Sequence, residues 1–327
     1  MRFAAPGRGL TLDSVERPFR FGLQVFGAQS RREWQDHARR AEALGFDTIL
    51  VPDHVLTPGP FSPIAALAAL AEVTSRLRIG TLVLNNDLRH PALVARDAAT
   101  LDLLSDGRVE LGIGAGHAQP EYAEIGIPFE RAATRVERLE ESVRILRQLS
   151  AGETVTMDGA HYTLRSHALF PRRCVRLLVG GNGNNVLRIA AEHADIVGFT
   201  GLGRTLDDGQ RHEAHWRLED IDAKVDHVRR AAGDRIADLE FNVLVQEVRI
   251  TDDRDAAIDE IARRVDADPA MLRTAPFVLI GSPEQIVEQL HHARERWGFS
   301  YFVTRSPDAT APIIDALGDR REGAGSA

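Results

Sequence analysis

The stretch SRREWQDHARRAEALGFDTILVPDH, residues 30–54, decides the fold because it contains one complete helix–strand unit. Ser30 and Glu33 have the spacing of a capping box, apolar residues recur on one face of the turns that follow, and Gly45 is a typical helix end. The apolar run at 47–51 then predicts a short buried strand. A strand that directly follows a capped helix is a building unit of α/β proteins.

The same unit recurs near the other end of the chain, where Ser282 and Pro283 begin a helix and Gly298 ends it before another apolar run. Continuous apolar runs between the two units indicate a parallel sheet covered on both faces. We expect eight strands, at 21–26, 47–51, 78–84, 109–113, 177–179, 196–200, 241–250 and 301–304. Further helices are expected at 62–75, 91–104, 131–149, 184–193 and 218–232. Eight alternating units predict an α/β fold, a closed (β/α)8 TIM barrel with insertions.

Two stretches interrupt this alternation. Residues 152–171 alternate apolar and polar side chains around an Asp-Gly pair, which predicts an inserted β-hairpin. Residues 251–276 form a charged segment with a helical pattern. Because neither stretch resembles a linker, we expect one domain over 19–317. The ends, 1–18 and 318–327, are expected to be flexible tails.

Composition excludes several classes of function. A formal net charge of −8 argues against a broad nucleic-acid-binding face, and the apolar stretch 64–71 is too short to span a membrane. Cys174 is the only cysteine, so a reducing cytoplasm is the expected location. The histidines do not have the spacing of a known zinc motif, and no metal site is predicted. An open dinucleotide-binding sheet is a rival fold, but GIGAGH at 112–117 lacks the glycine spacing of that motif.

Polar residues and glycines cluster just after the expected strands, where a barrel has its active site. His54 is a candidate proton donor or acceptor, and Asp53 could orient it, although both residues could also simply cap the strand. Asn85 could donate a hydrogen bond to the carbonyl group of a ring. The fourth expected strand is followed by a glycine-rich turn that could approach a planar ligand, with Gly114, Gly116 and His117. The fifth is followed by a loop that leads into a helix and could bind phosphate, with Gly180, Gly181, Asn182 and Gly183.

These residues occur in blocks that resemble a known superfamily. The blocks include AEALGFDTILVPDH, LRIGTLVLNNDLRHPALVARDAATLDLLSDGRVELGIGAGH and LLVGGNGNNVLRIAAEHADIVGF, in that order. They are similar to the conserved blocks of the bacterial luciferase-like oxidoreductases, which are (β/α)8 barrels that use reduced FMN or the deazaflavin coenzyme F420. The combination of blocks looks most like the F420-dependent branch, and the resemblance also implies a homodimer.

The resemblance implies roles for individual residues. In the F420-dependent branch an Asp-His pair lies over the coenzyme ring, which implies Asp53 and His54 here, with His54 as the acid or base. A cis peptide bond that does not precede proline lies behind the ring in that branch, and its place here is expected to be Thr81-Leu82. The phosphate of the coenzyme tail is expected at 180–183.

The chain also departs from the F420-dependent sugar-phosphate dehydrogenases of that branch. His117 and Pro120 stand where those enzymes have a glutamate and an asparagine, which argues against the same sugar-phosphate substrate. The sequence thus favours an F420-dependent oxidoreductase that transfers a hydride between the coenzyme and a small organic molecule. An FMN-dependent monooxygenase and a barrel that binds a cofactor without catalysis are the alternatives.

Overall fold

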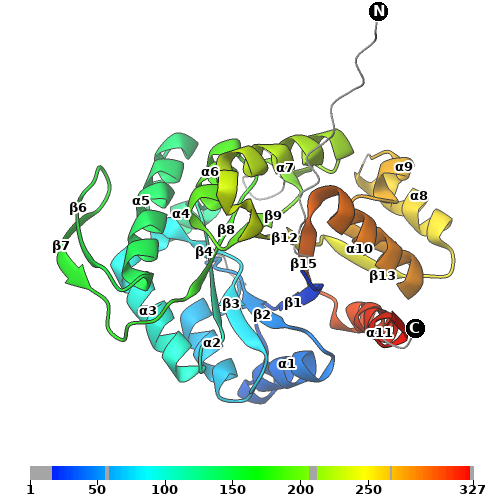
Figure 1. The fold of residues 1–327 in the computed structure, drawn as a ribbon, viewed down its shortest axis with the longest axis horizontal. Helices are drawn as coiled ribbons and strands as arrows, with labels where there is room; N and C mark the ends of the chain where they lie inside the picture. Colours follow the sequence, from blue (N-terminus) through cyan, green and yellow to red (C-terminus); the bar gives the residue numbers. More distant parts are fainter. Residues whose placement is uncertain (1–16, 56–58, 206–211, 266, 325–327) are drawn as a thin grey trace, which may run out of the picture.

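The computed structural model describes residues 17–55, 59–205, 212–265 and 267–324, in which a ring of parallel strands is surrounded by helices (Figure 1). The sheet order is β3-β2-β1-β15-β12-β9-β8-β5-β4, and an additional pairing of β3 with β5 closes it. The strands are β1 (Arg20–Gln24), β2 (Thr48–Val51), β3 (Arg78–Thr81), β4 (Leu84–Asn85), β5 (Val109–Gly114), β8 (Arg176–Gly180), β9 (Ile196–Phe199), β12 (Glu240–Leu244) and β15 (Phe299–Thr304). Since β4 resumes the course of β3, the predicted eight-stranded barrel is confirmed.

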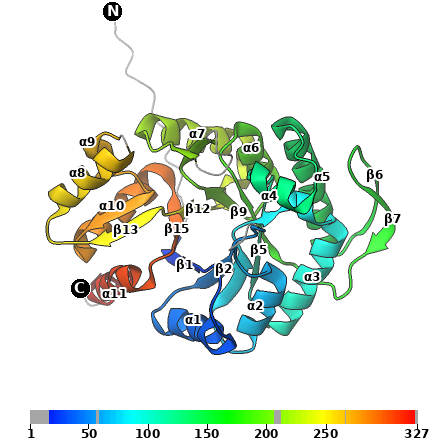
Figure 2. The same ribbon diagram turned by 180° about the vertical axis from the view of Figure 1, so that it is seen from behind.

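The helices of the outer layer follow the barrel strands in turn (Figure 2). In α1 the Ser30 hydroxyl accepts a hydrogen bond from the Glu33 amide, as the capping pattern predicted. The apolar face of α1 is buried. The layer consists of α1 (Arg31–Ala43), α2 (Pro63–Ala71), α3 (Pro91–Leu104), α5 (Ala132–Ser150), α6 (Asn184–His193), α7 (Leu218–Ala232), α10 (Pro283–Trp297) and α11 (Pro307–Ala324). Short 3₁₀ turns, η1 (Asn86–Leu88) and η2 (Gly233–Ala237), follow β4 and α7.

The single strand predicted at 241–250 is wrong, because only its first half belongs to the barrel. The chain leaves the barrel after β12, and β13 (Glu247–Ile250) pairs with β14 (Val278–Gly281) outside it. The Gln246 amide starts this second sheet by donating to the Phe277 carbonyl, at 2.7 Å. Two helices, α8 (Arg254–Val265) and α9 (Pro269–Leu272), fill the charged segment between these strands. Strand β14 and helix α4 (Gln119–Ile125) were not predicted.

Two antiparallel pairs lie outside the barrel. The stretch 152–171 contains β6 (Thr154–Asp158) and β7 (Thr163–Ala168), and Figure 1 shows this hairpin beside α5 at the edge of the molecule. A second pair, β10 (Leu202–Thr205) and β11 (His212–Ala214), follows β9. Helix α11 runs to Ala324 and so occupies most of the tail expected at 318–327. Most of the expected N-terminal tail, residues 1–16, lies outside the described residues.

The amino ends of the barrel strands carry a buried layer of charges. The Arg20 guanidinium donates to Glu110 at 2.6 Å and to Glu240 at 2.8 Å, and Arg176 bridges the same two carboxylates at 3.2 and 2.9 Å. Arg78 Nε lies 2.9 Å from Glu110. Burial opposes the ionisation of Glu110, but the three arginines outweigh burial and hold its pKa below the ordinary value. This face of a barrel ordinarily serves stability.

Candidate functional site

Asp53 links the loops that follow β2 and β4 at the carboxyl end of the barrel strands. Its buried carboxylate is paired with the Arg89 guanidinium and accepts a hydrogen bond from the Asn85 amide at 3.0 Å. Both oxygens are engaged, since Arg89 Nη2 also donates to Oδ1 at 3.1 Å. Arg89 and the Asn85 amide therefore fix the position of the Asp53 carboxylate, and the predicted catalytic role of Asp53 stays a prediction.

His54 points to a partner that sequence reasoning missed. Its Nδ1 lies 2.5 Å from Oε1 of Glu121, whose side chain is only 4% exposed, while the imidazole is 35% exposed. Glu121 Oε2 also accepts a weaker bond from the Val55 amide at 3.4 Å. A buried carboxylate beside Nδ1 favours the tautomer with the proton on that nitrogen. Nε2 then has no proton of its own and can exchange one with a ligand.

The imidazole of His117 lies next to that of His54. The two imidazole rings are 5.6 Å apart and almost perpendicular. His117 comes from the turn between β5 and α4, whereas His54 follows β2. The mouth of the barrel therefore presents two imidazoles from separate segments, one of them fixed by a buried carboxylate.

Asn85 serves a hydrogen-bond network beneath this turn. Its side-chain oxygen accepts from the Tyr122 hydroxyl at 3.0 Å and from the Asp87 amide at 3.1 Å. Burial raises the pKa of Tyr122, so its hydroxyl keeps the proton that it donates. Gly116, at φ +72°, passes so close that an added Cβ would lie 2.1 Å from the Tyr122 hydroxyl. Asn85 and Gly116 thus shape the turn, and only the Asn85 amide nitrogen is left for a ring carbonyl.

The cis peptide bond expected at Thr81-Leu82 is wrong by one residue. It is Leu82-Val83, because the Leu82 amide still donates to the Val51 carbonyl, at 3.1 Å, and continues the regular pairing of β3. Thr81 is held inside the sheet, where its hydroxyl bonds both backbone groups of Gly112. The predicted contacts of Thr81 and Leu82 with a cofactor stay predictions.

The Val83 side chain lies against three glycines of the neighbouring strands, although at Gly112 an added Cβ would first meet the Thr81 carbonyl oxygen, at 2.1 Å. An added Cβ at Gly114 would lie 2.9 Å from Val83 Cγ2, and one at Gly112 or Gly180 would lie 3.2 Å from Val83 Cγ1. These contacts are tighter than ordinary van der Waals contact. Gly114 and Gly180 therefore make room for a bulge at the barrel mouth, formed by Leu82 and Val83 between β3 and β4.

The loop before α6 has the features of an anion site. Gly183 is the N-cap residue of α6, and no side chain of the described residues caps this helix. An added Cβ at Gly183 would meet nothing within 4 Å, whereas one at Gly181 would lie 2.8 Å from Val186. Asn182 accepts a hydrogen bond from the Thr200 hydroxyl at 2.6 Å. Free amides at a helix start, with open space beside Gly183, suit a phosphate group.

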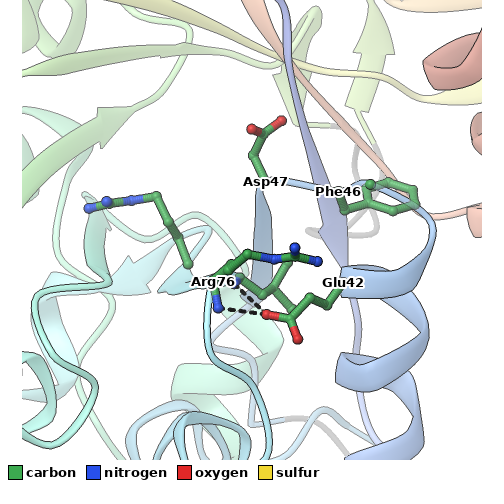
Figure 3. A pocket seen from close by; sticks show the side chains of 7 residues that line it. Glu42, Phe46, Asp47 and Arg76 are labelled. Carbon is green, nitrogen blue, oxygen red and sulfur yellow. Dashed lines mark hydrogen bonds between the residues drawn. The ribbon is translucent and has the colours of Figure 1, made fainter. Parts of the chain in front are cut away.

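A pocket of about 400 Å³ lies at the opposite end of the barrel from these residues (Figure 3). Glu42, Asp47 and Arg76 line it, near the starts of β2 and β3. One Glu42 oxygen accepts hydrogen bonds from the consecutive amides of residues 75–77. These amides, which oppose burial, lower the pKa of Glu42. These three amides are already bonded to the Glu42 carboxylate and are not available to a ligand. We therefore assign the pocket a structural role.

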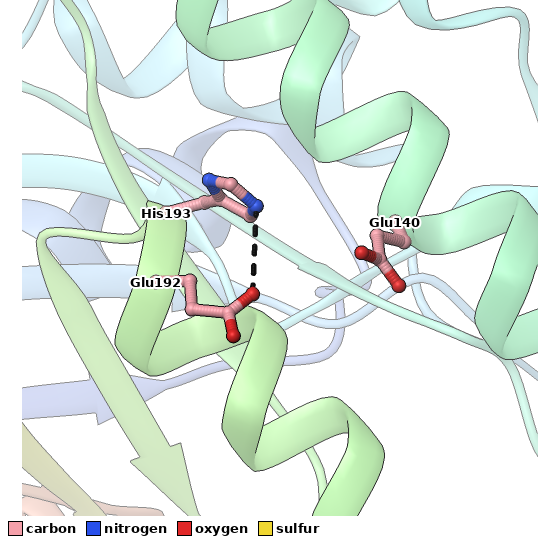
Figure 4. A group of neighbouring side chains, drawn as sticks. All are labelled: Glu140, Glu192 and His193. Atoms are coloured by element: carbon pink, nitrogen blue, oxygen red, sulfur yellow. Dashed lines mark ion pairs between the residues drawn. The ribbon is translucent and has the colours of Figure 1, made fainter. Parts of the chain in front are cut away.

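Glu140, Glu192 and His193 lie close enough together to hold a metal ion (Figure 4). Arg188 already neutralises both carboxylates, with contacts of 2.7 Å to Glu140 and 2.6 Å to Glu192. Arg144 adds a second contact to Glu140 at 2.6 Å. This group lies on α5 and α6, away from the strand ends, and we assign it to helix packing.

Comparison with known proteins identifies the family. The family model described as "Luciferase-like monooxygenase" matches residues 17–301. The chain belongs to the luciferase-like family. Within the described residues, no helix combines the length and apolar character needed to cross a membrane.

Two relatives of this luciferase-like chain are F420-dependent glucose-6-phosphate dehydrogenases. The protein from Kribbella flavida is 30% identical over 90% of this chain and 93% of its own length. The protein from Beutenbergia cavernae is 31% identical over 82% of this chain and 85% of its own length. Both alignments therefore cover most of this chain.

Solved structures share the luciferase-like fold. The F420-dependent tetrahydromethanopterin reductase from Methanopyrus kandleri superposes with a TM-score of 0.70 over 91% of this chain and 97% of its own, at 18% identity. An F420-dependent secondary alcohol dehydrogenase, solved with an F420-acetone adduct, has the same TM-score over 92% and 98%, at 20% identity. At these identities the likeness concerns the fold alone.

Proposed function

We propose that the chain is an F420-dependent oxidoreductase that transfers a hydride between the coenzyme and a small organic molecule. The observation that carries this proposal is His54, held by the buried Glu121 beside the bulge at the barrel mouth. The two relatives of about 30% identity support F420 as the coenzyme.

The residues present fit this coenzyme. The uncapped start of α6 and the open space at Gly183 suit the phosphate of its tail, and the Val83 bulge offers an apolar surface for its ring. When bound, the coenzyme supplies the hydride chemistry. His54 would give or take a proton through Nε2, while Glu121 holds Nδ1.

The substrate is inferred to differ from glucose 6-phosphate. His117 and Pro120 occupy the positions at which the sequence departs from the sugar-phosphate dehydrogenases. The imidazole of His117, next to His54, changes the surface that a substrate meets. Glucose 6-phosphate should therefore leave F420 unreduced in the presence of this protein.

Titration of the protein with each coenzyme tests the proposal. Because the chain's full-length relatives are F420-dependent, we expect F420 to bind in the micromolar range and FMN to bind much more weakly, measured by coenzyme fluorescence. Preference for FMN together with oxygen consumption would favour the monooxygenase alternative. Binding of neither coenzyme would refute the proposal and leave a barrel without this chemistry.

We also infer a homodimer in the cytoplasm. Leu93 and Leu104, three turns apart on the same face of α3, are 48% and 55% exposed, and the neighbouring α2 is apolar over most of its length. Cys174 is an exposed free cysteine, which suits a reducing compartment.

A double variant tests the dimer. Leu93→Lys with Leu104→Lys places two charges on the apolar face and should convert a dimer into a monomer, measured by sedimentation velocity. Ile250→Lys is the control, because Ile250 is also partly exposed but lies on β13 outside the barrel. A wild-type monomer, or a double variant that stays dimeric, would exclude this face as the interface.

A further inference from the structure

A chain of side-chain hydrogen bonds crosses the mouth of the barrel. It begins at the Leu82 carbonyl, which belongs to the cis peptide of the bulge and accepts from Gln24 Nε2 at 2.8 Å. The Gln24 oxygen in turn accepts from Arg305 Nε at 2.7 Å. Gln24 is only 4% exposed, and Leu82 packs in the inner core of the barrel. Arg305, just after β15, is therefore anchored over the interior of the barrel.

The series of hydrogen bonds continues on the other side of Arg305. Its Nη1 donates a longer bond, 3.4 Å, to the Gln246 oxygen, and Gln246 Nε2 donates to the Thr200 carbonyl at 3.0 Å. The Thr200 hydroxyl reaches Asn182 in the loop before α6. We define the mouth belt by the residues Leu82, Gln24, Arg305, Gln246, Thr200 and Asn182.

Arg305 is the charged member of this belt, and its protein partners are neutral. Among the residues that the structure describes, no carboxylate lies within ion-pair distance of its guanidinium. By contrast, Arg89 and Arg138, near the same end of the barrel, are paired with Asp53 and Asp87. The Arg305 side chain is exposed, yet the protein around it removes enough water to lower its pKa, with no charge to oppose this effect.

The two bonds to amide oxygens leave a defined part of the guanidinium open. Nε and Nη1 are directed at Gln24 and Gln246, so the orientation of the group is set before any ligand arrives. Nη2 has no acceptor in the described part of the chain. Three of the five N–H groups of the guanidinium therefore remain, and the pair along its Nη1–Nη2 edge matches the two oxygens of a carboxylate.

We propose that Arg305 binds a carboxylate of the substrate and so selects small organic acids as the molecules that this barrel oxidises or reduces. The assignment of this anion to the substrate rests on the proposed function, because the belt begins at the bulge where the coenzyme ring is expected. Arg305 is a specificity residue in this scheme, and His54 handles the proton.

Calorimetric titration with benzoate tests the proposal, with benzamide as the neutral probe of the same shape. Both are titrated into the wild type and into Arg305→Gln, with and without saturating F420. We expect benzoate to bind the wild type more tightly than benzamide, and Arg305→Gln to weaken benzoate binding ~10-fold or more, because a charge-assisted hydrogen bond is lost. Benzamide binding should not change.

Two further variants keep the test decisive. Arg230→Gln removes another exposed arginine, on α7, whose contact is a backbone carbonyl, and should bind benzoate like the wild type. Arg305→Lys keeps the charge and should bind benzoate more tightly than Arg305→Gln does.

Three results would overturn the proposal. The first is equal binding of benzoate and benzamide to the wild type, and the second is equal binding of benzoate to the two Arg305 variants. The third is a loss of F420 affinity in Arg305→Gln without a loss of benzoate affinity, which would place the anion on the coenzyme. Failure of the wild type to bind F420 while benzoate still binds would instead refute the proposed function and leave the anion site intact.

Discussion

In the Glu110→Gln variant we expect the free energy of unfolding at neutral pH to fall by about 3–5 kcal/mol, because one partner of a buried ion network is removed. Arg20, Arg78 and Arg176 all direct a nitrogen at the same Glu110 oxygen. Glutamine is neutral, and its amide hydrogens would face these donors if the group turned over. Denaturant titration followed by circular dichroism measures the loss.

The pH dependence separates this effect from a simple packing defect. The pKa of Glu110 is lowered in the folded protein, so its stabilisation is complete above the ordinary value of 4.5 and is lost as the pH falls through the lowered folded-state value. The difference between wild type and Glu110→Gln should therefore shrink in acid. Glu260→Gln, which removes a carboxylate paired with Arg249 on the surface, is the control and should change stability little. A Glu110→Gln protein with wild-type stability at neutral pH would contradict the assigned role.

In the His54→Ala variant we expect turnover to fall roughly 10²–10⁴-fold, because a positioned acid or base is lost. The assay uses F420 and any substrate that the wild type accepts. The affinity for F420, measured by fluorescence, should stay close to the wild-type value, since the loop at 180–183 and the bulge at Leu82 and Val83, where we propose that the coenzyme binds, are unchanged. Wild-type turnover in His54→Ala would refute the proton-transfer role.

Glu121 should act through His54 and not on its own. Glu121→Ala removes the acceptor for Nδ1 and should slow turnover, and the double variant with His54→Ala should be no slower than His54→Ala alone. Glu121→Gln keeps an acceptor oxygen and should recover part of the rate. Glu124→Ala, an exposed change on the same helix, is the control. Additive losses in the double variant would show that Glu121 has a separate function.

The barrel could be predicted from the sequence because each strand is an apolar run beside a helix signal. Even the run at 48–51, which is soon followed by Asp53 and His54, has all four residues buried. The error at 241–250 arose because β13 extends the apolar pattern of β12 after only two residues, 245 and 246. Its partner β14 comes from an apolar run just before the capped helix α10. The two strands are far apart in the sequence, so a local pattern does not show that they pair.

The site was predictable in part. Position after a strand marked His54, His117 and the loop at 180–183, since parallel strands bring their ends together. Glu121 was missed because α4 is only seven residues long, too short for a periodic pattern, and PEY reads like a loop. The one weak signal was Pro120, which often stands in the first turn of a helix and so places Glu121 near its start. Arg305 could not be predicted, because its role depends on the absence of a carboxylate near its guanidinium among the described residues, which sequence does not show.

The mouth belt belongs to the barrel itself and not to the segments inserted between its strands and helices. Its members sit on the barrel strands or within a few residues of them, so the strand ends are tied together without help from the long excursions such as the hairpin β6–β7. Those excursions are then free to vary in length and sequence. A lineage built on this plan could change the molecules that it accepts by exchanging loops, while the residues that we propose to hold the proton donor and the coenzyme keep their relative positions.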